Sequence, residues 1–390
     1  MPWRETWPMR ERLWFVQECR REYFTVVELC HFFGVSPKTG YKWLERFRDE
    51  GPKGLEDRSR APKSCPHRTP AEAEEVLLRI RRRHRDWGPG KIRDYLMGSS
   101  PDQLWPARST IADILRRHGL VKPRRRRPRP GHPGFRGTVP THPNGLWTAD
   151  FKGQFRVGNG QMCFPLTVLD GYSRFLLGCQ GLERPLHDAV QPVFERLFRE
   201  FGLPQAIRTD NGTPFASLAV RRLSRLHVWW IKLGITPELT LPGHPQHNAS
   251  HERFHRTLKD LTARPPAGTP RAQQRAFDRF RQEYNEVRPH EANAGHPPAH
   301  VYRPSPRPYP RQLPDVEYPP HFERRMVYHN GVIRWHRQRI VISQVLEGEP
   351  VGLEEERDGL WSVYFGPILL GRLDERNHNF RGLFPHTQSS

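Results

Sequence analysis

Apolar residues recur at helical spacing over residues 9–49, and a short turn with glycine interrupts them in TVVELCHFFGVSPKTGYKWLERF. Ser36 is a typical N-cap residue and Pro37 a typical first helical residue, so a second helix is expected to begin there. Two helices joined by a tight turn, the second of them basic, are typical of a helix-turn-helix, with an ordinary helical hairpin as the alternative. We expect a DNA-binding domain over residues 1–60, with contacts from Lys38, Lys42 and Arg46.

The next segment, residues 66–121, repeats the helical pattern. TPAEAEEVLLRIRRRH places acids early and bases late, as the helix dipole favours. WGPGKIRDYL and RSTIADILRRHGL predict two more helices, the last ended by Gly119. We expect a second DNA-binding unit here, of the helix-turn-helix or winged-helix-like kind.

Residues 144–302 change to short apolar runs. NGLWTADFKGQF, MCFPLTVLDGYS and RFLLGCQGL predict three strands, with Asn-Gly and Asp-Gly turns between them. HDAVQPVFERLFREFG predicts a helix, QAIRTDNG a strand, residues 219–234 an extended helix and TPELTL a further strand before the next helix. The order βββαβαβα predicts an α/β core in which helices cover a mixed sheet.

The last part of the chain predicts a proline-rich linker over residues 303–322 and a small all-β domain, SH3-like, over residues 323–375. Apolar and polar residues alternate in RRMVYHNGVIRWHRQRIVIS and DGLWSVYFGPILLGRLD, around Asn-Gly and Asp-Gly turns. Residues 376–390 are expected to form a tail.

The net charge of the chain indicates the kind of partner that it binds. The chain carries 63 Lys and Arg against 42 Asp and Glu, a net charge of +21, which favours a polyanion such as nucleic acid. The stretch KPRRRRPRP begins a basic linker over residues 122–143, kept extended by proline and like charge. We expect phosphate contacts from Arg124, Arg125, Arg126 and Arg127.

Five cysteines without a CxxC pair indicate reduced thiols in a cytoplasmic protein. No apolar run approaches 18 residues, so neither a membrane span nor a secretory leader is expected. Structural zinc is not expected either, because the spacing of the N-terminal Cys and His residues fits no zinc site.

Three carboxylates in the central segment stand apart from their neighbours. Asp150 lies within the apolar run LWTADF, Asp210 ends AIRTDNG, and Glu252 is the one acid of PQHNASHERFHRTLK. Two carboxylates from strands and one from a helix can bind two hard divalent cations, which clamp an in-line displacement at phosphorus. Asp170 is a rival that a turn between strands explains better. A turn role for Asp210 and a solvent-facing Glu252 are the alternatives.

The blocks WTADF, VLDGYSRF, RTDNGTPFAS, PGHPQHNASHERFHRTLK and YNEVRPHEA resemble those of the DDE integrase-core transposases of bacterial insertion sequences. These are relatives of retroviral integrases with an RNase H-like fold. The resemblance implies that Asp150, Asp210 and Glu252 bind two Mg²⁺ or Mn²⁺ ions. It also implies cleavage at terminal inverted repeats of double-stranded DNA, attack of the freed 3′-hydroxyl on target DNA, and at least a dimer on DNA.

Helical spacing puts positions 252, 255, 256 and 259 on one face. We therefore expect His255, Arg256 and Lys259 to hold DNA phosphates, with a solvated basic face as the alternative. Ala249 stands where the family usually has glycine, a change that costs little if the backbone there is already helical. The competing function is a catalytically impaired DNA-binding relative that acts as a regulator.

Overall fold

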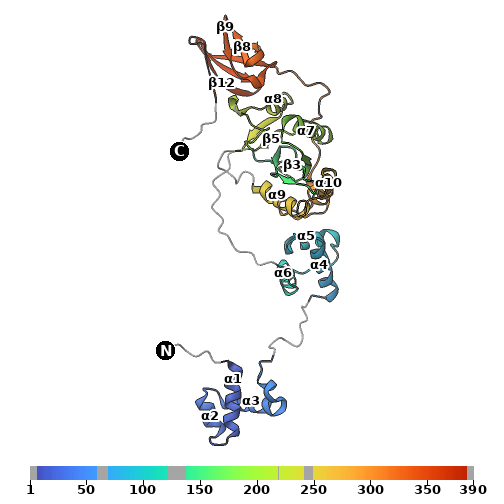
Figure 1. Ribbon diagram of the computed structural model, residues 1–390, viewed down its shortest axis with the longest axis vertical. Helices are drawn as coiled ribbons and strands as arrows, with labels where there is room; N and C mark the ends of the chain where they lie inside the picture. The colour runs from blue at the N-terminus through green and yellow to red at the C-terminus, as the bar shows by residue number, and fades with distance from the viewer. Residues whose placement is uncertain (1–6, 59–68, 122–137, 218, 241–248, 384–390) are drawn as a thin grey trace. The chain divides into compact units, whose positions relative to one another are not determined.

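Two compact units, divided at residue 68, make up the chain, and each is described by itself. The computed structural model describes residues 7–58, 69–121, 138–217, 219–240 and 249–383 (Figure 1). Arg124 to Arg127 lie outside these residues, so the contacts expected of them stay predictions.

The N-terminal unit consists of α1 (Pro8–Arg20), α2 (Val26–Phe32), α3 (Pro37–Glu50) and the 3₁₀ turn η1 (Gly51–Leu55). Ser36 Oγ accepts a hydrogen bond from Thr39 N at 3.3 Å, which confirms the predicted start of α3. Gly40 permits the close approach of α2 and α3, because a Cβ there would lie 2.3 Å from Cys30 Sγ. The helices enclose a small core of Phe15, Val16, Leu29, Cys30, Trp43 and Leu55.

The second helical segment confirms the three predicted helices, α4 (Ala71–Arg83), α5 (Pro89–Ser99) and α6 (Arg108–Arg117). They pack around Trp87, Ile92 and Ile111. Residues 69–121 contain no strand in the structure, so this part of the chain has helices without a wing.

The central sheet is mixed, as predicted. Its strands are β1 (Leu146–Phe151), β2 (Phe155–Arg156), β3 (Met162–Asp170), β4 (Leu176–Leu182), β5 (Ala206–Thr209) and β6 (Thr236–Leu239). They follow the order β2-β3-β1-β5-β6, with β4 beside β3. β1 runs antiparallel to β3 and parallel to β5, and β5 runs parallel to β6.

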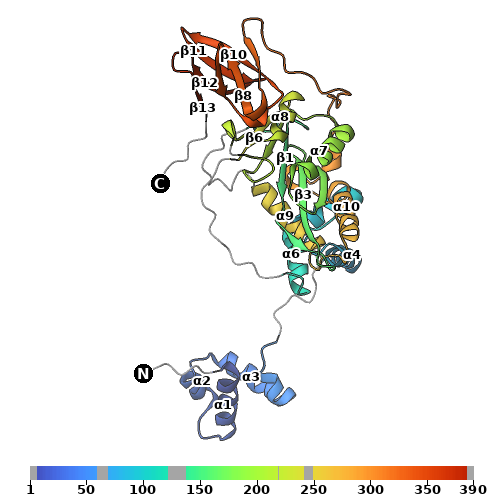
Figure 2. The same ribbon diagram turned by 45° about the horizontal axis from the view of Figure 1, so that its top comes forward.

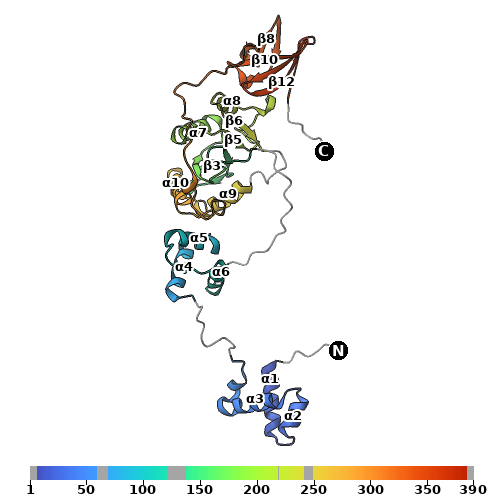
Figure 3. The same cartoon turned by 180° about the vertical axis from the view of Figure 1, so that it is seen from behind.

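Helices cover both faces of this sheet, because its strands carry buried apolar residues on both faces. The helices are α7 (His187–Phe201), α8 (Arg225–Lys232), α9 (Ala249–Thr262), α10 (Pro270–Glu286) and the short α11 (Pro298–Val301). Trp147 and Val168 pack with α7 and α8 residues, whereas Leu169 and Leu176 pack with α9 and α10 residues. In Figures 2 and 3, α9 and α10 lie side by side, away from α7 and α8.

The predicted extended helix over residues 219–234 is wrong in its first half. A 3₁₀ turn, η2 (Val220–Arg222), precedes α8, and both Arg221 and Arg222 have positive φ, at 55° and 56°. Ser224 Oγ then accepts a hydrogen bond from His227 N at 3.3 Å and caps α8. Irregular backbone, not a longer helix, takes up the residues between β5 and α8.

The proline-rich segment packs on the core over much of its length. Tyr302 is buried, stacks on Phe175 with ring centroids 4.3 Å apart, and donates a hydrogen bond to Asn144 Oδ1 at 2.9 Å. Arg307 donates to the carbonyls of Pro204, Leu233 and Gly234, each at 2.9 Å. The segment therefore straps α7, α8 and the start of β5 together. Its prolines keep it extended, which suits this course.

The C-terminal part is all-β and antiparallel, as predicted. A five-stranded sheet has the order β13-β12-β11-β10-β7, and β8 pairs with β9. The strands are β7 (Glu323–Met326), β8 (Val332–Trp335), β9 (Gln338–Val341), β10 (Pro350–Arg357), β11 (Leu360–Phe365), β12 (Ile368–Asp374) and β13 (Asn379–Gly382), with 3₁₀ turns η5 (His329–Gly331) and η6 (Gln344–Leu346). Across the described ranges, every helix is too short or too polar to cross a bilayer.

Candidate active site and nucleic-acid interface

Asp150 and Asp210 lie side by side near the C-terminal ends of the neighbouring strands β1 and β5. The last residue pair of the parallel β1–β5 ladder is Ala149 with Thr209, and each aspartate directly follows one member of this pair. Ala149 is buried against α7 and α8, so alternation turns Asp150 toward the face that α9 covers. Both carboxylates are half-buried.

Helix α9 lies against Asp150. His255 Nδ1 is 3.9 Å from Asp150 Oδ2. His251 and His255 both reach Thr167 Oγ1 through Nε2, at 3.1 and 2.8 Å. Thr167 faces Asp150 across the β1–β3 register and donates to its carbonyl oxygen at 3.0 Å. One hydroxyl thus ties the strand that carries Asp150 to the helix.

Glu252 belongs to the first turns of α9, between these two histidines. Its side chain is outside the described part of the structure, so the predicted third carboxylate stays a prediction. The backbone of its turn is nevertheless placed, because His251 and His255 on either side of it contact Thr167. Among the side chains that are described, no three His, Cys, Asp or Glu residues come close enough together to hold a metal.

The electrostatics around Asp210 suit a bound cation. Burial raises the pKa of Asp210, and a hydrogen bond from Gly212 N at 3.2 Å opposes this only in part. A carboxylate that is costly to ionise gains most from a nearby positive charge. Paired carboxylate oxygens are also the donors that Mg²⁺ and Mn²⁺ prefer. The residues present therefore fit a hard divalent cation.

Lys152 is a site residue that the sequence reasoning missed. Burial and the neighbouring Lys259 lower the pKa of Lys152, and Asp150 raises it, so both charged groups lie near its ammonium. The available signal was its place two residues after Asp150 in WTADFK. Lys259 and Arg256 are exposed on α9, as a phosphate contact requires.

His255 differs from its prediction as a phosphate contact. Its ring is 6% exposed and bonds to Thr167. Burial, with His251 and Lys152, lowers its pKa well below the usual range, so it is neutral at neutral pH. Helical spacing predicts one face for His255, Arg256 and Lys259, but only the two basic residues are exposed, whereas the His255 ring turns toward β3 and bonds to Thr167. His255 is therefore not available for contact with a DNA phosphate.

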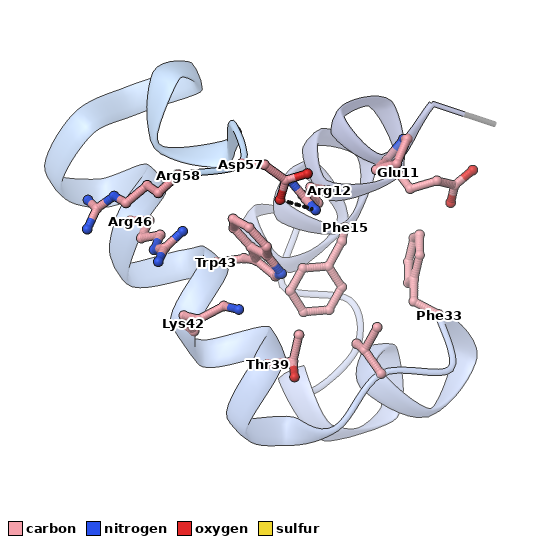
Figure 4. A pocket seen from close by; sticks show the side chains of 12 residues that line it. Glu11, Arg12, Phe15, Phe33, Thr39, Lys42, Trp43, Arg46, Asp57 and Arg58 are labelled. Atoms are coloured by element: carbon pink, nitrogen blue, oxygen red, sulfur yellow. Dashed lines mark hydrogen bonds and ion pairs between the residues drawn. The ribbon is translucent and has the colours of Figure 1, made fainter. Parts of the chain in front are cut away.

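The N-terminal unit offers a second basic site on α3. Three cations surround the Trp43 ring: Arg12 Cζ lies 4.0 Å from its centroid, Lys42 Nζ 4.4 Å and Arg46 Cζ 5.1 Å. They line an open pocket of about 750 Å³, together with Arg58 and others (Figure 4). Lys38 is exposed one turn before Lys42. Arg12 comes from α1 and was not predicted.

Family models match the helical part of the chain and its central core. Residues 11–63 match a helix-turn-helix domain and residues 39–115 a homeodomain-like domain. Residues 140–245 and 233–298 match integrase core domain models. These matches cover both helical segments and the central sheet with α9 and α10.

Relatives come from mobile elements and retroviruses. An uncharacterised protein of insertion element IS407 from Burkholderia multivorans is 34% identical over 47% of this chain, and one of IS476 from Xanthomonas euvesicatoria is 28% identical over 57%. A Gag-Pol polyprotein of baboon endogenous virus is 25% identical over 48%. The matches span 64%, 62% and 10% of those proteins' own lengths.

Proposed function

We propose that the chain is a transposase of the integrase-core superfamily that cuts and joins DNA strands, because residues 140–245 and 233–298 match integrase core domain models and its relatives include insertion-element proteins. The observation that carries the proposal is the placement of Asp150 and Asp210 on adjacent strand ends, with α9 held against Asp150. Its substrates are then the terminal repeats of its own element and a target duplex, in the bacterial cytoplasm.

In this proposal Asp150, Asp210 and Glu252 hold two Mg²⁺ or Mn²⁺ ions. Bound ions would activate the attacking oxygen and neutralise the leaving one during in-line displacement at phosphorus. The chain itself positions the DNA. Lys152, which lies near both Asp150 and Lys259, is suited together with Lys259 to neutralise the phosphates next to the scissile bond.

The helical segments hold the DNA away from the chemistry. Lys38, Lys42 and Arg46 line one side of α3, the second helix of a helix-turn-helix, which in this motif enters the major groove. Joining two element ends to one target needs two active sites, so we propose at least a dimer on DNA.

A cleavage assay on labelled DNA that contains both ends of the encoding element tests the proposal. Wild type is expected to nick the ends with Mg²⁺ or Mn²⁺ and to stop when the cation is chelated. Asp210→Asn should bind the ends as wild type does without cutting them. Asp188→Asn, the same change on a 98%-exposed side chain, is the matched control and should cut.

End binding without cleavage by wild type, in any divalent cation, would favour the alternative of a regulator. Equal loss of binding and cleavage in Asp210→Asn would mean that Asp210 is structural instead. A change in the denaturation midpoint of Asp210→Asn separates that outcome from a local loss of chemistry.

A further inference from the structure

Thr167 stands at a junction of three hydrogen bonds. Its Oγ1 lies 3.0 Å from the carbonyl oxygen of Asp150, 2.8 Å from His255 Nε2 and 3.1 Å from His251 Nε2. The hydroxyl is fully buried, as are both imidazoles. Because buried polar groups that lose their partners are costly, this junction constrains all three residues together.

The proton count at the junction has one solution that satisfies all three contacts. A hydroxyl donates one hydrogen and accepts two. The Asp150 carbonyl can only accept, so the Thr167 proton goes to it. His251 and His255 must then each donate from a protonated Nε2.

His255 also lies beside the Asp150 carboxylate. With Nε2 donating to Thr167, the other ring nitrogen, Nδ1, is 3.9 Å from Asp150 Oδ2. The hydrogen bond to Thr167 therefore sets the position of this ring relative to the carboxylate.

The junction also sets the position of α9. Its anchors, at residues 251 and 255, are successive turns of one helix face, and Glu252 lies between them. The opposite partner, Thr167, is on β3, directly across from Asp150. A shift of α9 along the sheet would break two buried hydrogen bonds at once. The distance between the backbones of Asp150 and Glu252 is therefore fixed by Thr167.

From this geometry we infer that His255 and Thr167 are positioning residues of the active site. Thr167 accepts a hydrogen bond from the protonated Nε2 of His255, seats the α9 turn of Glu252 against Asp150, and holds the His255 ring beside the Asp150 carboxylate. The inference rests on the proposed function for its catalytic meaning, whereas the hydrogen bond from His255 Nε2 to Thr167 is a property of the protein alone. Groups that hold and orient ligands in this way typically change metal affinity or activity by about 10–100-fold when removed.

The substitution Thr167→Val keeps the shape of the side chain and removes the hydroxyl, and Thr167→Ser keeps the hydroxyl. Thr262→Val is the matched control, since Thr262 Oγ1 is also buried but bonds within α9, to Leu258 O at 2.7 Å. Cleavage of element-end DNA is measured against Mn²⁺ concentration. Thr167→Val should need about tenfold more Mn²⁺ for half-maximal cleavage, while Thr167→Ser and Thr262→Val stay close to wild type.

Two results would overturn the inference: an unchanged Mn²⁺ dependence in Thr167→Val, or an equal shift in Thr262→Val. Long-range ¹H–¹⁵N spectra of the full chain with ¹⁵N-histidine give an independent readout, with His255 assigned by His255→Gln. The expected signal is a protonated Nε2. An unprotonated Nε2 contradicts the inference. If wild type cuts nothing, the proposed function fails, and this spectrum still decides whether His255 Nε2 donates to Thr167.

Discussion

Asp150 and Thr167 face each other in the β1–β3 register, and Thr167 Oγ1 donates to the Asp150 carbonyl at 3.0 Å. This pair joins the two halves of the candidate site. Strand β1 supplies the carboxylate of Asp150. The Thr167 hydroxyl opposite it anchors α9, the helix to which Glu252 belongs. The sheet and its contact with α9 therefore set the spacing of residues 150, 210 and 252, which are far apart in the chain, as the proposed joint action of their carboxylates requires.

Binding of element ends is expected to depend on Lys42. Its ammonium lies on the exposed side of α3, 4.4 Å from the Trp43 centroid. If it contacts one phosphate, Lys42→Gln weakens binding and flattens the slope of log K against log salt by about 0.9. Arg20→Gln removes the same charge from the exposed end of α1 and should leave the slope unchanged. Equal slopes in the two variants would argue against a phosphate contact at Lys42.

Alanine at position 249 is expected to be compatible with activity. α9 begins at Ala249, so the backbone there needs no glycine. Ala249→Gly should lower the free energy of unfolding by up to about 1 kcal/mol and leave the cleavage rate unimproved. The same change in the first turn of α10, Ala272→Gly, calibrates the cost. A large gain in cleavage by Ala249→Gly would instead identify the natural chain as impaired.

Arg307 is expected to contribute strongly to core stability, although it lies in the proline-rich segment. Its guanidinium donates to three backbone carbonyls on the core. Hydrogen bonds from a charged group are worth about 1.5–3 kcal/mol, so Arg307→Ala should lower the free energy of unfolding by about that amount. Arg311→Ala, on an exposed arginine of the same segment, should change it little. Denaturant titration distinguishes a strap from a free linker.

His227 makes stability depend on pH. Burial lowers its pKa in the folded protein from 6.5 to about 4, so between these values the unfolded chain binds more protons. The contribution of neutral His227 to the free energy of unfolding is therefore complete above pH 6.5 and is lost as the pH falls toward 4. Between pH 7.5 and 5 the loss is about 2 kcal/mol.

Urea titrations test the role of His227. The free energy of unfolding should fall less between these pH values in His227→Phe than in wild type. His329→Gln, on an 80%-exposed side chain, should behave as wild type. Identical pH dependence in all three would remove His227 as the cause.

Local patterns predicted much of the fold, because their causes are local. The cap at Ser36 and the short apolar runs of β1 and β3 depend on neighbours in the chain. The break before α8 could not be predicted from them, because the apolar spacing is continuous and the positive φ values at Arg221 and Arg222 arise where η2 meets the C-terminal sheet.

The site was predictable in its carboxylates and less so in its surroundings. Asp150 and Asp210 stand out as acids at strand ends, whereas the burial of His255 depends on Thr167, which lies 88 residues away in the chain. The place of Lys152 near Asp150 and Lys259 is likewise seen only in the folded chain. Tertiary packing, not helical spacing, decides which side of α9 meets DNA.

The central claim, that the chain joins DNA strands at this site, is tested most directly by strand transfer from pre-cut ends. Element ends with a 3′-hydroxyl, or with a 3′-deoxy terminus, are incubated with target DNA, Mn²⁺ and either wild type or Asp150→Asn. Joined products are predicted only from wild type with the 3′-hydroxyl, while both proteins bind the ends equally. Joining by Asp150→Asn, or no joining by wild type on ends that it binds, would contradict the account.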